Sequence, residues 1–333
     1  MNGRNFGRSA VRIASKQKAL IAIIAMYLIM LVLNLSGAKT NFLTPYNQLD
    51  MLNSASITLI LSAGVTLVII TAGCDLSVGG MLSLSGIVTI MLMEYLPIPL
   101  AILGALALGA FVGFINGFFV VHQKTEPFII TLGMGMVLKG ISQEVTNAHP
   151  ISPKNSAFMK IGNGKIFGMI PNLVVIMLAV LVIIYLVLRY TQFGRNLYAV
   201  GGDYEVAVYA GINARRTKWA AFIISGVTAA LGGVLLSSKL NSGNSIYGDP
   251  YPLLIHCGAV IGGTSLTGGK GGIIQTFIGL MALAVLQNCM NMVTAIMNVS
   301  TIASYIQQLV QGVVIVGILW LDCFGVKRKR EAV

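Results

Sequence analysis

The stretch IPNLVVIMLAVLVIIYLVLR, at residues 170–189, decides the fold class of this chain. It holds no charged residue before Arg189, and its length matches the ~20 apolar residues that a helix needs to cross the hydrocarbon core of a bilayer. A second run of this kind, LIAIIAMYLIMLVLNLS, occupies residues 20–36. These runs predict transmembrane helices rather than the core of a soluble domain.

The composition extends this prediction to the whole chain. Of 333 residues, 56% are hydrophobic and only 10% are charged. Soluble proteins carry about a quarter charged residues, whereas lipid-facing side chains need no charge. We therefore expect an all-α, polytopic membrane protein with about ten transmembrane helices, some short or discontinuous, in a single domain over residues 1–333. The candidate spans are 20–36, 53–72, 78–93, 98–121, 127–146, 170–189, 216–238, 252–263, 271–290 and 301–321.

The basic residues predict an orientation. If the N-terminus lies inside and the spans alternate, sixteen of the 22 Lys and Arg fall on the cytoplasmic side, as the positive-inside rule requires. Residues 1–19, the loop 190–215 and the tail 323–333 are then cytoplasmic, and residues 147–169 lie outside. Eight or twelve spans fit the charge count almost as well. Because the net charge of +12 is explained by this clustering, a nucleic-acid partner is not expected.

An enzyme is disfavoured by the motifs that are missing. GGTSLTGGKGG, at 262–272, resembles a phosphate-binding loop, but Thr264 replaces its first glycine and Gly271 replaces its Ser/Thr. This stretch therefore predicts a tight turn between two spans. The four cysteines suggest neither a disulfide framework nor a zinc site, and we expect no cofactor or metal. A channel is a further alternative, but no filter motif or charge ring supports it.

One acidic and one basic residue lie within or beside apolar segments. Asp75, in GCDLSVGG at 73–80, is interpreted mainly as a cap for the helix that follows it. Lys139 lies inside the span 127–146 and can reach its outer end by snorkelling, although a charge within a span also raises the possibility of function. Glycines at 109, 113 and 117 share one helix face and predict close helix packing.

The central loop carries a short predicted helix. In GGDYEVAVYAGI, at 201–212, mixed apolar residues lie between glycines, and acids lie near the start, where the helix dipole favours them. Such a surface could dock against another protein or lie on the membrane. Both interpretations fit the composition.

Four segments in chain order resemble the permease subunits of bacterial sugar-type ABC importers, the ribose permease family. The first is GCDLSVGG, and the others are EPFIITLGMGMVLKG at 126–140, TQFGRNLYAVGGDYEVAVYAGI at 191–212 and GAVIGGTSLTGGKGG at 258–272. Together they span nearly the whole chain. The related permeases for branched-chain amino acids share the broader architecture and remain the main alternative.

The resemblance implies a division of labour in the bacterial inner membrane. It implies an extracytoplasmic solute-binding protein, a second permease subunit (the same chain or a paralogue), and separate ATPase subunits that contact a coupling helix at about 203–210. The candidate coupling residues are Gly201, Gly202, Asp203, Glu205, Ala207, Ala210 and Gly211. The candidate residues of the solute path are Asp75, Ser77, Gly79, Asn288, Asn291 and Gln307. The sequence leaves the solute itself open.

Overall fold

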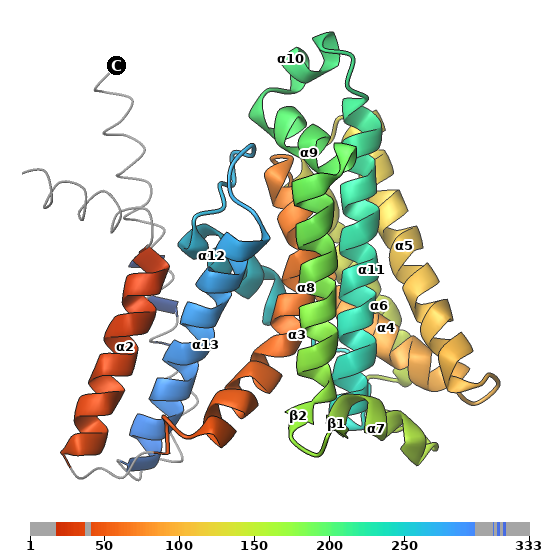
Figure 1. Cartoon of the computed structure of the whole chain (residues 1–333). Coiled ribbons are helices and arrows are strands. Elements are labelled where there is room, and N and C mark those ends of the chain that lie inside the picture. Colours follow the sequence, from red (N-terminus) through yellow and green to blue (C-terminus); the bar gives the residue numbers. More distant parts are fainter. Residues whose placement is uncertain (1–17, 37–40, 297–308, 310–311, 314–315, 318–333) are drawn as a thin grey trace, which may run out of the picture. The chain divides into compact units, whose positions relative to one another are not determined.

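A computed structural model of the chain describes residues 18–36, 41–296, 309, 312–313 and 316–317 (Figure 1). Within these residues almost every element is a helix, and the named strands form one two-stranded hairpin. The prediction of an all-α polytopic membrane protein is confirmed. The longer helices are α2 Lys18–Leu35, α3 Pro45–Ile70, α4 Val78–Leu92, α5 Ile98–His122, α6 Pro127–Thr146, α8 Asn172–Tyr190, α11 Ala214–Leu240, α12 Tyr251–Gly262 and α13 Ile273–Ile296.

Six of these helices, α3, α5, α6, α8, α11 and α13, are long and apolar enough to cross a membrane. Helices α2, α4 and α12 are apolar but shorter. All nine correspond to predicted spans, and apart from the start of α3 and the end of α13 each predicted end lies within two residues of the observed one. The tenth predicted span, 301–321, falls largely outside the described residues, as do most of the N-terminal segment and the whole C-terminal tail.

Helix α3 begins eight residues before its predicted start, in a polar segment. Thr44 caps it, because the Thr44 Oγ1 accepts a hydrogen bond from the Asn47 backbone N–H at 3.3 Å, and Pro45 occupies the first helical position. The side-chain amides of Asn47 and Gln48 both donate to the Phe42 carbonyl, at 2.9 and 2.6 Å. These local bonds start the helix where hydropathy gives no signal.

The chain falls into two compact units, each with its own core. Unit 1 comprises residues 1–52, 257–263 and 275–333, and unit 2 comprises 53–256 and 264–274. The core of unit 1 joins α2 to α13, with the buried residues Met30, Phe42, Met51, Val285 and Cys289.

Helix α11 runs through unit 2 alongside α5 and α4 (Figure 1). A Cβ on Gly109 would come within 2.4 Å of the Gly226 carbonyl oxygen, and one on Gly113 within 2.3 Å of the Phe222 oxygen. Gly117 faces Trp219 just as closely. Only glycine permits the approach of two backbones at Gly109 and Gly113, and Gly117 leaves room for the Trp219 ring, so the predicted packing role of the α5 glycines is confirmed.

The segment 147–169, predicted as a loop, contains two short elements. Helix α7, Ser156–Asn163, is capped by Asn155, whose Oδ1 accepts from the Ala157 N–H at 2.9 Å. It is followed by an antiparallel hairpin of β1, Lys165–Ile166, and β2, Ile170–Pro171. The Gly162 N–H donates to the Ser238 Oγ at 2.8 Å, which fixes α7 to the end of α11.

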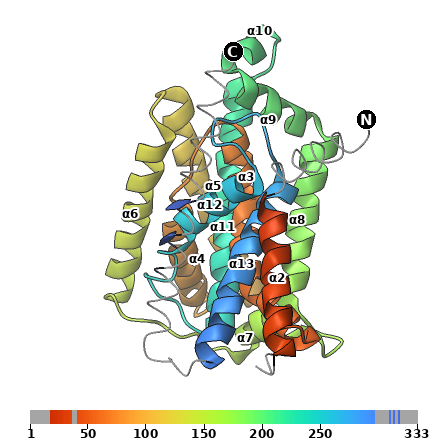
Figure 2. The same cartoon turned by 90° about the vertical axis from the view of Figure 1, so that its left-hand side faces the viewer.

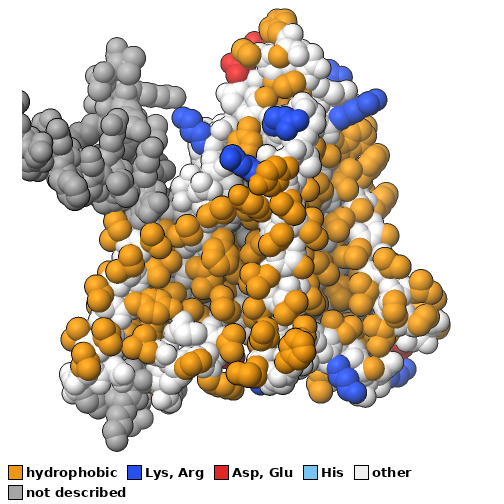
Figure 3. All heavy atoms as spheres, viewed as in Figure 1, with side chains coloured by type: hydrophobic (Ala, Val, Ile, Leu, Met, Phe, Trp, Pro, Cys, Tyr) orange, Lys and Arg blue, Asp and Glu red, His pale blue; other side chains and the backbone are white. Residues whose placement is uncertain are grey.

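The surface of unit 2 has the layout of a membrane protein. In Figure 3, hydrophobic side chains cover the face of α8, while Lys and Arg side chains lie near the ends of the helices. Large apolar side chains of α8 are exposed at Val175, Leu178, Val182, Ile183 and Leu186. Such a face is stable only against lipid or another apolar surface.

The orientation gives a first testable prediction. In a variant that lacks the native cysteines, Phe167→Cys is expected to react with an impermeant thiol reagent in intact cells, because Phe167 lies at the tip of the β1–β2 hairpin and is 94% exposed. Tyr209→Cys, at a position of α10 that is 88% exposed and lies in the loop predicted to be cytoplasmic, is expected to react only after the cells are opened. The reverse pattern would contradict the predicted orientation.

Candidate functional site

Two helix breaks meet in unit 2. Helix α3 ends at Ile70 and α4 begins at Val78, while a second connection, 241–250, follows α11 and leads into α12. A Cβ on Gly248 would lie 1.8 Å from the Gly79 carbonyl oxygen, so the two backbones touch. At 1.5 Å per residue, the 15-residue α4 and the 12-residue α12 are too short to cross a core ~30 Å thick. Short helices that begin at such breaks are where transporters place their solute sites.

Asp75 holds the first break together. The Asp75 Oδ1 accepts from the Ser77 backbone N–H at 3.1 Å and from the Ser77 hydroxyl at 2.6 Å. Its Oδ2 accepts from the Ser225 hydroxyl of α11 at 2.6 Å. The Asn116 amide of α5 donates in turn to the Ser77 Oγ at 2.8 Å. The carboxylate therefore joins the break to α5 and α11. It does not cap α4 as predicted, because Ser77 occupies the N-cap position and α4 has no side-chain cap hydrogen bond.

His256 and Thr131 fix the backbone of the same break. The His256 Nδ1 lies 2.7 Å from the Pro252 carbonyl, which can only accept, so the hydrogen belongs on Nδ1. Its Nε2 is then an acceptor for the Asp75 N–H at 3.4 Å. The Thr131 Oγ1 of α6 accepts from the Leu76 N–H at 3.0 Å. Nothing in the sequence indicates this role of His256, because Asp75 and His256 lie 181 residues apart.

Among the residues proposed for the solute path, Asp75 and Ser77 are buried and hydrogen-bonded within the break, and Gly79 is closed over by the backbone of Gly248. In unit 1, Asn288 and Asn47 exchange two amide hydrogen bonds, at 3.0 and 3.2 Å. These contacts favour a helix-joining role, and the solute-path role remains a prediction. Asn291 is exposed on α13, and Gln307 lies outside the described residues.

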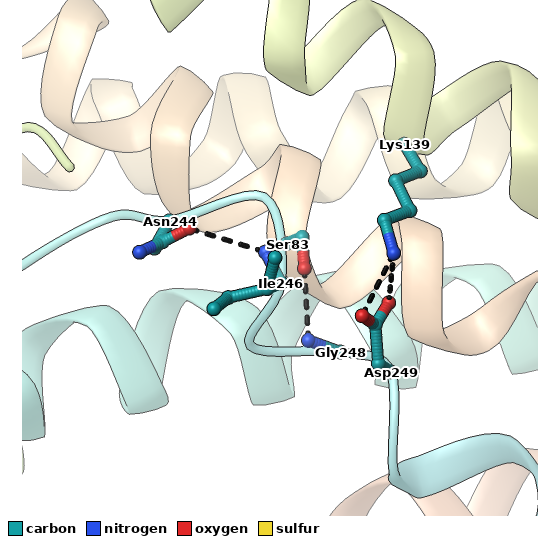
Figure 4. A network of polar contacts seen from close by, with 6 residues as sticks. All are labelled: Ser83, Lys139, Asn244, Ile246, Gly248 and Asp249. Atoms are coloured by element: carbon teal, nitrogen blue, oxygen red, sulfur yellow. Dashed lines mark hydrogen bonds and ion pairs between the residues drawn. The ribbon is translucent and has the colours of Figure 1, made fainter. Parts of the chain in front are cut away.

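Lys139 forms an ion pair at the second break. Its Nζ lies 2.8 and 2.7 Å from the two carboxylate oxygens of Asp249, the residue before Pro250 at the start of α12 (Figure 4). The expected snorkelling toward the outer end of α6 is replaced by this contact across to another element. Neither the partner nor its direction could be read from the span 127–146 alone.

The central loop forms two helices. Helix α9, Gln192–Gly202, was not predicted, and Gly201 and Gly202 form its last two residues. Helix α10, Tyr204–Tyr209, matches the predicted helix at 203–210 and lies at the tip of unit 2 (Figure 1).

Both ends of α10 are capped. The Asp203 Oδ1 accepts from the Val206 N–H at 3.0 Å. At the other end Gly211 has a φ of +80°, and the Ile212 and Gly211 N–H groups donate to the Ala207 and Val208 carbonyls, each at 3.0 Å. These two hydrogen bonds around a left-handed glycine form a Schellman motif, which ends α10 at a defined residue. The segment is therefore an ordered helix rather than a flexible loop.

The outward face of α10 differs from the expected one. Ala207 is buried against Val200 and Ala214 of the same chain, so it is not available to a partner. The large side chains that point outward are Val206, 62% exposed, and Tyr209, 88% exposed, with Tyr204 and Val208 beside them. Glu205 and Ala210 are also exposed. The outward face of α10 could not be predicted, because six residues of mixed apolar character do not reveal which side of the helix packs inward.

Helix α9 connects α10 to two membrane segments. A Cβ on Gly201 would lie 1.7 Å from the Ile70 carbonyl oxygen at the end of α3, and 2.7 Å from the Gly269 nitrogen. The Tyr198 hydroxyl donates to the Gly271 carbonyl at 2.9 Å. The 264–272 segment is the predicted tight turn, with positive φ at Gly268, Gly269 and Gly271. Any displacement of α9 must therefore move this turn and the end of α3.

Comparisons with known proteins agree with this architecture. The family model described as "Branched-chain amino acid transport system / permease component" matches residues 47–319. The chain is 35% identical over 316 residues to a ribose import permease protein of Escherichia coli (strain K12), which covers 92% of this chain and 93% of that protein. It is 35% identical over 283 residues to the D-allose transport system permease protein of the same strain, covering 84% of each. No solved structure matches.

A xylose transport system permease protein of Escherichia coli (strain K12) is 32% identical over 343 aligned positions, which cover 84% of this chain and 86% of that protein. The relatives thus match most of the length of both chains. Together with the six long apolar helices, they make this chain a multi-pass protein of the bacterial inner membrane and a transport subunit.

Proposed function

Because this chain belongs to the family of permease components of branched-chain amino acid transport systems, we propose that it is the membrane-spanning permease subunit of an ATP-driven importer of a sugar or sugar-like solute. The observation that carries the proposal is that three relatives, each covering 84% or more of this chain, are named as permeases for ribose, D-allose and xylose. A branched-chain amino acid is the second candidate, and the family description alone favours it.

The exposed face of α10 supports a separate ATPase subunit as the source of energy. Val206 and Tyr209 lie on a capped helix at the predicted cytoplasmic end, and exposed apolar side chains grouped in this way are typical of an interaction surface. A rigid helix can transmit a displacement, whereas a flexible loop cannot. We place the ATPase contact there, with α9 carrying movement to the end of α3 and to the 264–272 turn.

The proposed transport cycle needs further partners. An extracytoplasmic binding protein would deliver the solute, and a second permease subunit, identical or paralogous, would complete the path. The meeting of the two breaks at Gly79 and Gly248 supports a solute path nearby, because broken helices leave backbone groups available inside the membrane. In this arrangement Asp75 and Ser77 set the geometry of the break.

The proposal is tested by reconstituting the permease with its ATPase and binding-protein partners in liposomes. Pentoses, hexoses and branched-chain amino acids are supplied in turn, and accumulation inside the liposomes is measured with and without ATP. Uptake of at least one sugar that depends on ATP and on the binding protein is the expected result. Uptake of amino acids alone would support the second candidate instead.

A second testable prediction is that the purified permease alone neither binds nor hydrolyses ATP. The GGTSLTGGKGG stretch lacks the first glycine and the Ser/Thr of a phosphate-binding loop, and it forms a tight turn in which Thr264 bonds to Gly272. Binding of labelled nucleotide and release of phosphate are the measurements. Turnover that follows the permease through every purification step, and that disappears on mutation of Lys270, would contradict the prediction.

A further inference from the structure

The ion pair between Lys139 and Asp249 lies within the depth of a membrane span. Lys139 is seven residues before Thr146, the last residue of α6, so about 10 Å of helix separate it from that end. Asp249 belongs to the second break, next to Gly248, which touches the start of α4. Both charges are therefore placed where a bilayer would offer hydrocarbon.

The pair is only half-covered by its own chain. The side chains of Lys139 and Asp249 are 37% and 49% exposed. Of the six long apolar helices in the described residues, α6 is both the least apolar and the least buried. Beside the pair, Gly140 has no atom within 4 Å of the position where a Cβ would lie. Because charges in spans face protein or water rather than lipid, the pair is expected to border protein or water in the bilayer.

Figure 2 shows α6 at the edge of unit 2, beside α4 and α5. The buried residues of α6 are Thr131, Leu138, Ser142 and Thr146. Ser142 and Thr146 follow Lys139 by three and seven residues, so they lie on the same side of the helix as Lys139. Lys139 therefore stands at the edge of the packed face of α6, where its side chain reaches Asp249 of the 241–250 connection.

The backbone that carries the Asp249 side chain is held in place independently of Lys139. The Gly248 N–H donates to the Ser83 Oγ of α4 at 2.9 Å, and the Ile246 N–H donates to the Asn244 Oδ1 at 3.2 Å (Figure 4). These bonds fix the backbone of the connection one and three residues before the acid. A polar group that is held before the ligand arrives binds at a lower entropic cost than one that must be ordered.

From this geometry we propose that the Lys139–Asp249 pair is a contact site for the solute on the transport path and hydrogen-bonds sugar hydroxyl groups. The inference rests on the proposed function, which names the solute class. An ammonium group offers three N–H donors and a carboxylate about four acceptor positions, and their mutual bonds use only part of that capacity. A hydroxyl group can donate to the carboxylate and accept from the ammonium. Because the pair carries no net charge, it suits a neutral polyol better than an ion.

The test uses liposomes with the complete importer and a sugar that the wild type transports. Lys139→Gln and Asp249→Asn are each expected to lower the initial uptake rate about tenfold, since each removes a charge-assisted hydrogen bond to the solute. Analogues of the same sugar that lack one hydroxyl are then compared, with the binding protein saturated by each. The preference of the wild type for the full sugar over one such analogue is expected to shrink in both variants.

A structural role would give a different pattern. If the pair only pins the 241–250 connection, every solute slows by the same factor, and the exchanged pair K139D/D249K restores uptake together with the wild-type preference. That result, or wild-type uptake in the single variants, would overturn the inference. If the pair contacts the solute, the exchanged pair keeps an altered preference, because donor and acceptor have changed places.

The second described ion pair supplies a matched control. Lys154 and Glu94 lie 2.7 Å apart, the same separation as Lys139 and Asp249, but both belong to connections outside the spans. Lys154→Gln is expected to leave uptake and preference unchanged. Failure of the wild-type importer to transport any sugar would refute the proposed function and the site with it, whereas normal wild-type transport with unaffected variants would refute the site alone.

Discussion

Tyr209→Asp is expected to weaken binding of the ATPase subunit about a hundredfold and to stop uptake, while the permease itself stays folded. Tyr209 is 88% exposed on α10 and makes no aromatic contact among the described ring pairs, so its own chain loses little when the ring is replaced. In a contact with the ATPase the same ring would be buried. A carboxylate in its place would be buried without a partner, which costs several kcal/mol, on the order of the loss expected here.

The measurement is co-purification of the ATPase with the tagged permease, together with solute-stimulated ATP hydrolysis. Tyr95→Asp is the matched control, because Tyr95 is 83% exposed and lies in the connection between α4 and α5, on the predicted outer side. It is expected to leave ATPase binding unchanged. Full ATPase occupancy in the Tyr209→Asp importer would show that α10 is not the contact.

The structure also decides which substitutions cannot test this contact. Ala207, one of the candidate coupling residues, is buried with Val200 and Ala214, and Ile212 packs against them. An arginine there would disturb the fold of the loop before any partner is met. A loss of ATPase binding in such a variant would therefore not separate docking from folding.

The extent of the transmembrane helices could be predicted because hydropathy along the chain controls it. A span is apolar over the thickness of the bilayer, and the window that detects it is as long as the helix itself. The start of α3 escaped this signal because Thr44 and Asn47 begin the helix through hydrogen bonds rather than through hydropathy. Helix α9 escaped it as well, since two glycines at its end resemble a flexible joint.

The partners of single polar residues could not be predicted in the same way. Asp75 was recognised as unusual, but Ser225 and Asn116 are ordinary polar residues in apolar runs, and only the fold brings them to the carboxylate and to Ser77. Likewise, Lys139 was noted as an intramembrane charge without any indication that Asp249, 110 residues later, would face it. Sequence patterns identify the residue, and tertiary structure supplies its role.

The Asp75 network leads to the last prediction, which concerns stability. Asp75→Ala is expected to destabilise the folded permease by about 3 kcal/mol or more, because the Ser77 N–H, the Ser77 hydroxyl and the Ser225 hydroxyl would all lose a buried acceptor. Asp75→Asn is expected to cost much less. The amide keeps one acceptor oxygen, and its NH₂ group can donate to a serine hydroxyl, which is able to rotate and accept.

Thermal unfolding in detergent, followed by the fraction of permease that remains soluble and monodisperse, measures this order. Ser62→Ala is the matched control for loss of a buried polar group, since the Ser62 hydroxyl donates only to the Leu59 carbonyl one turn earlier in its own helix. It is expected to be nearly neutral. If Asp75→Ala unfolds at the wild-type temperature, the three donors do not depend on the carboxylate, and Asp75 is not committed to the break. A large gap between Asp75→Ala and Asp75→Asn would instead mean that an acceptor oxygen at position 75 holds the break together in the folded permease.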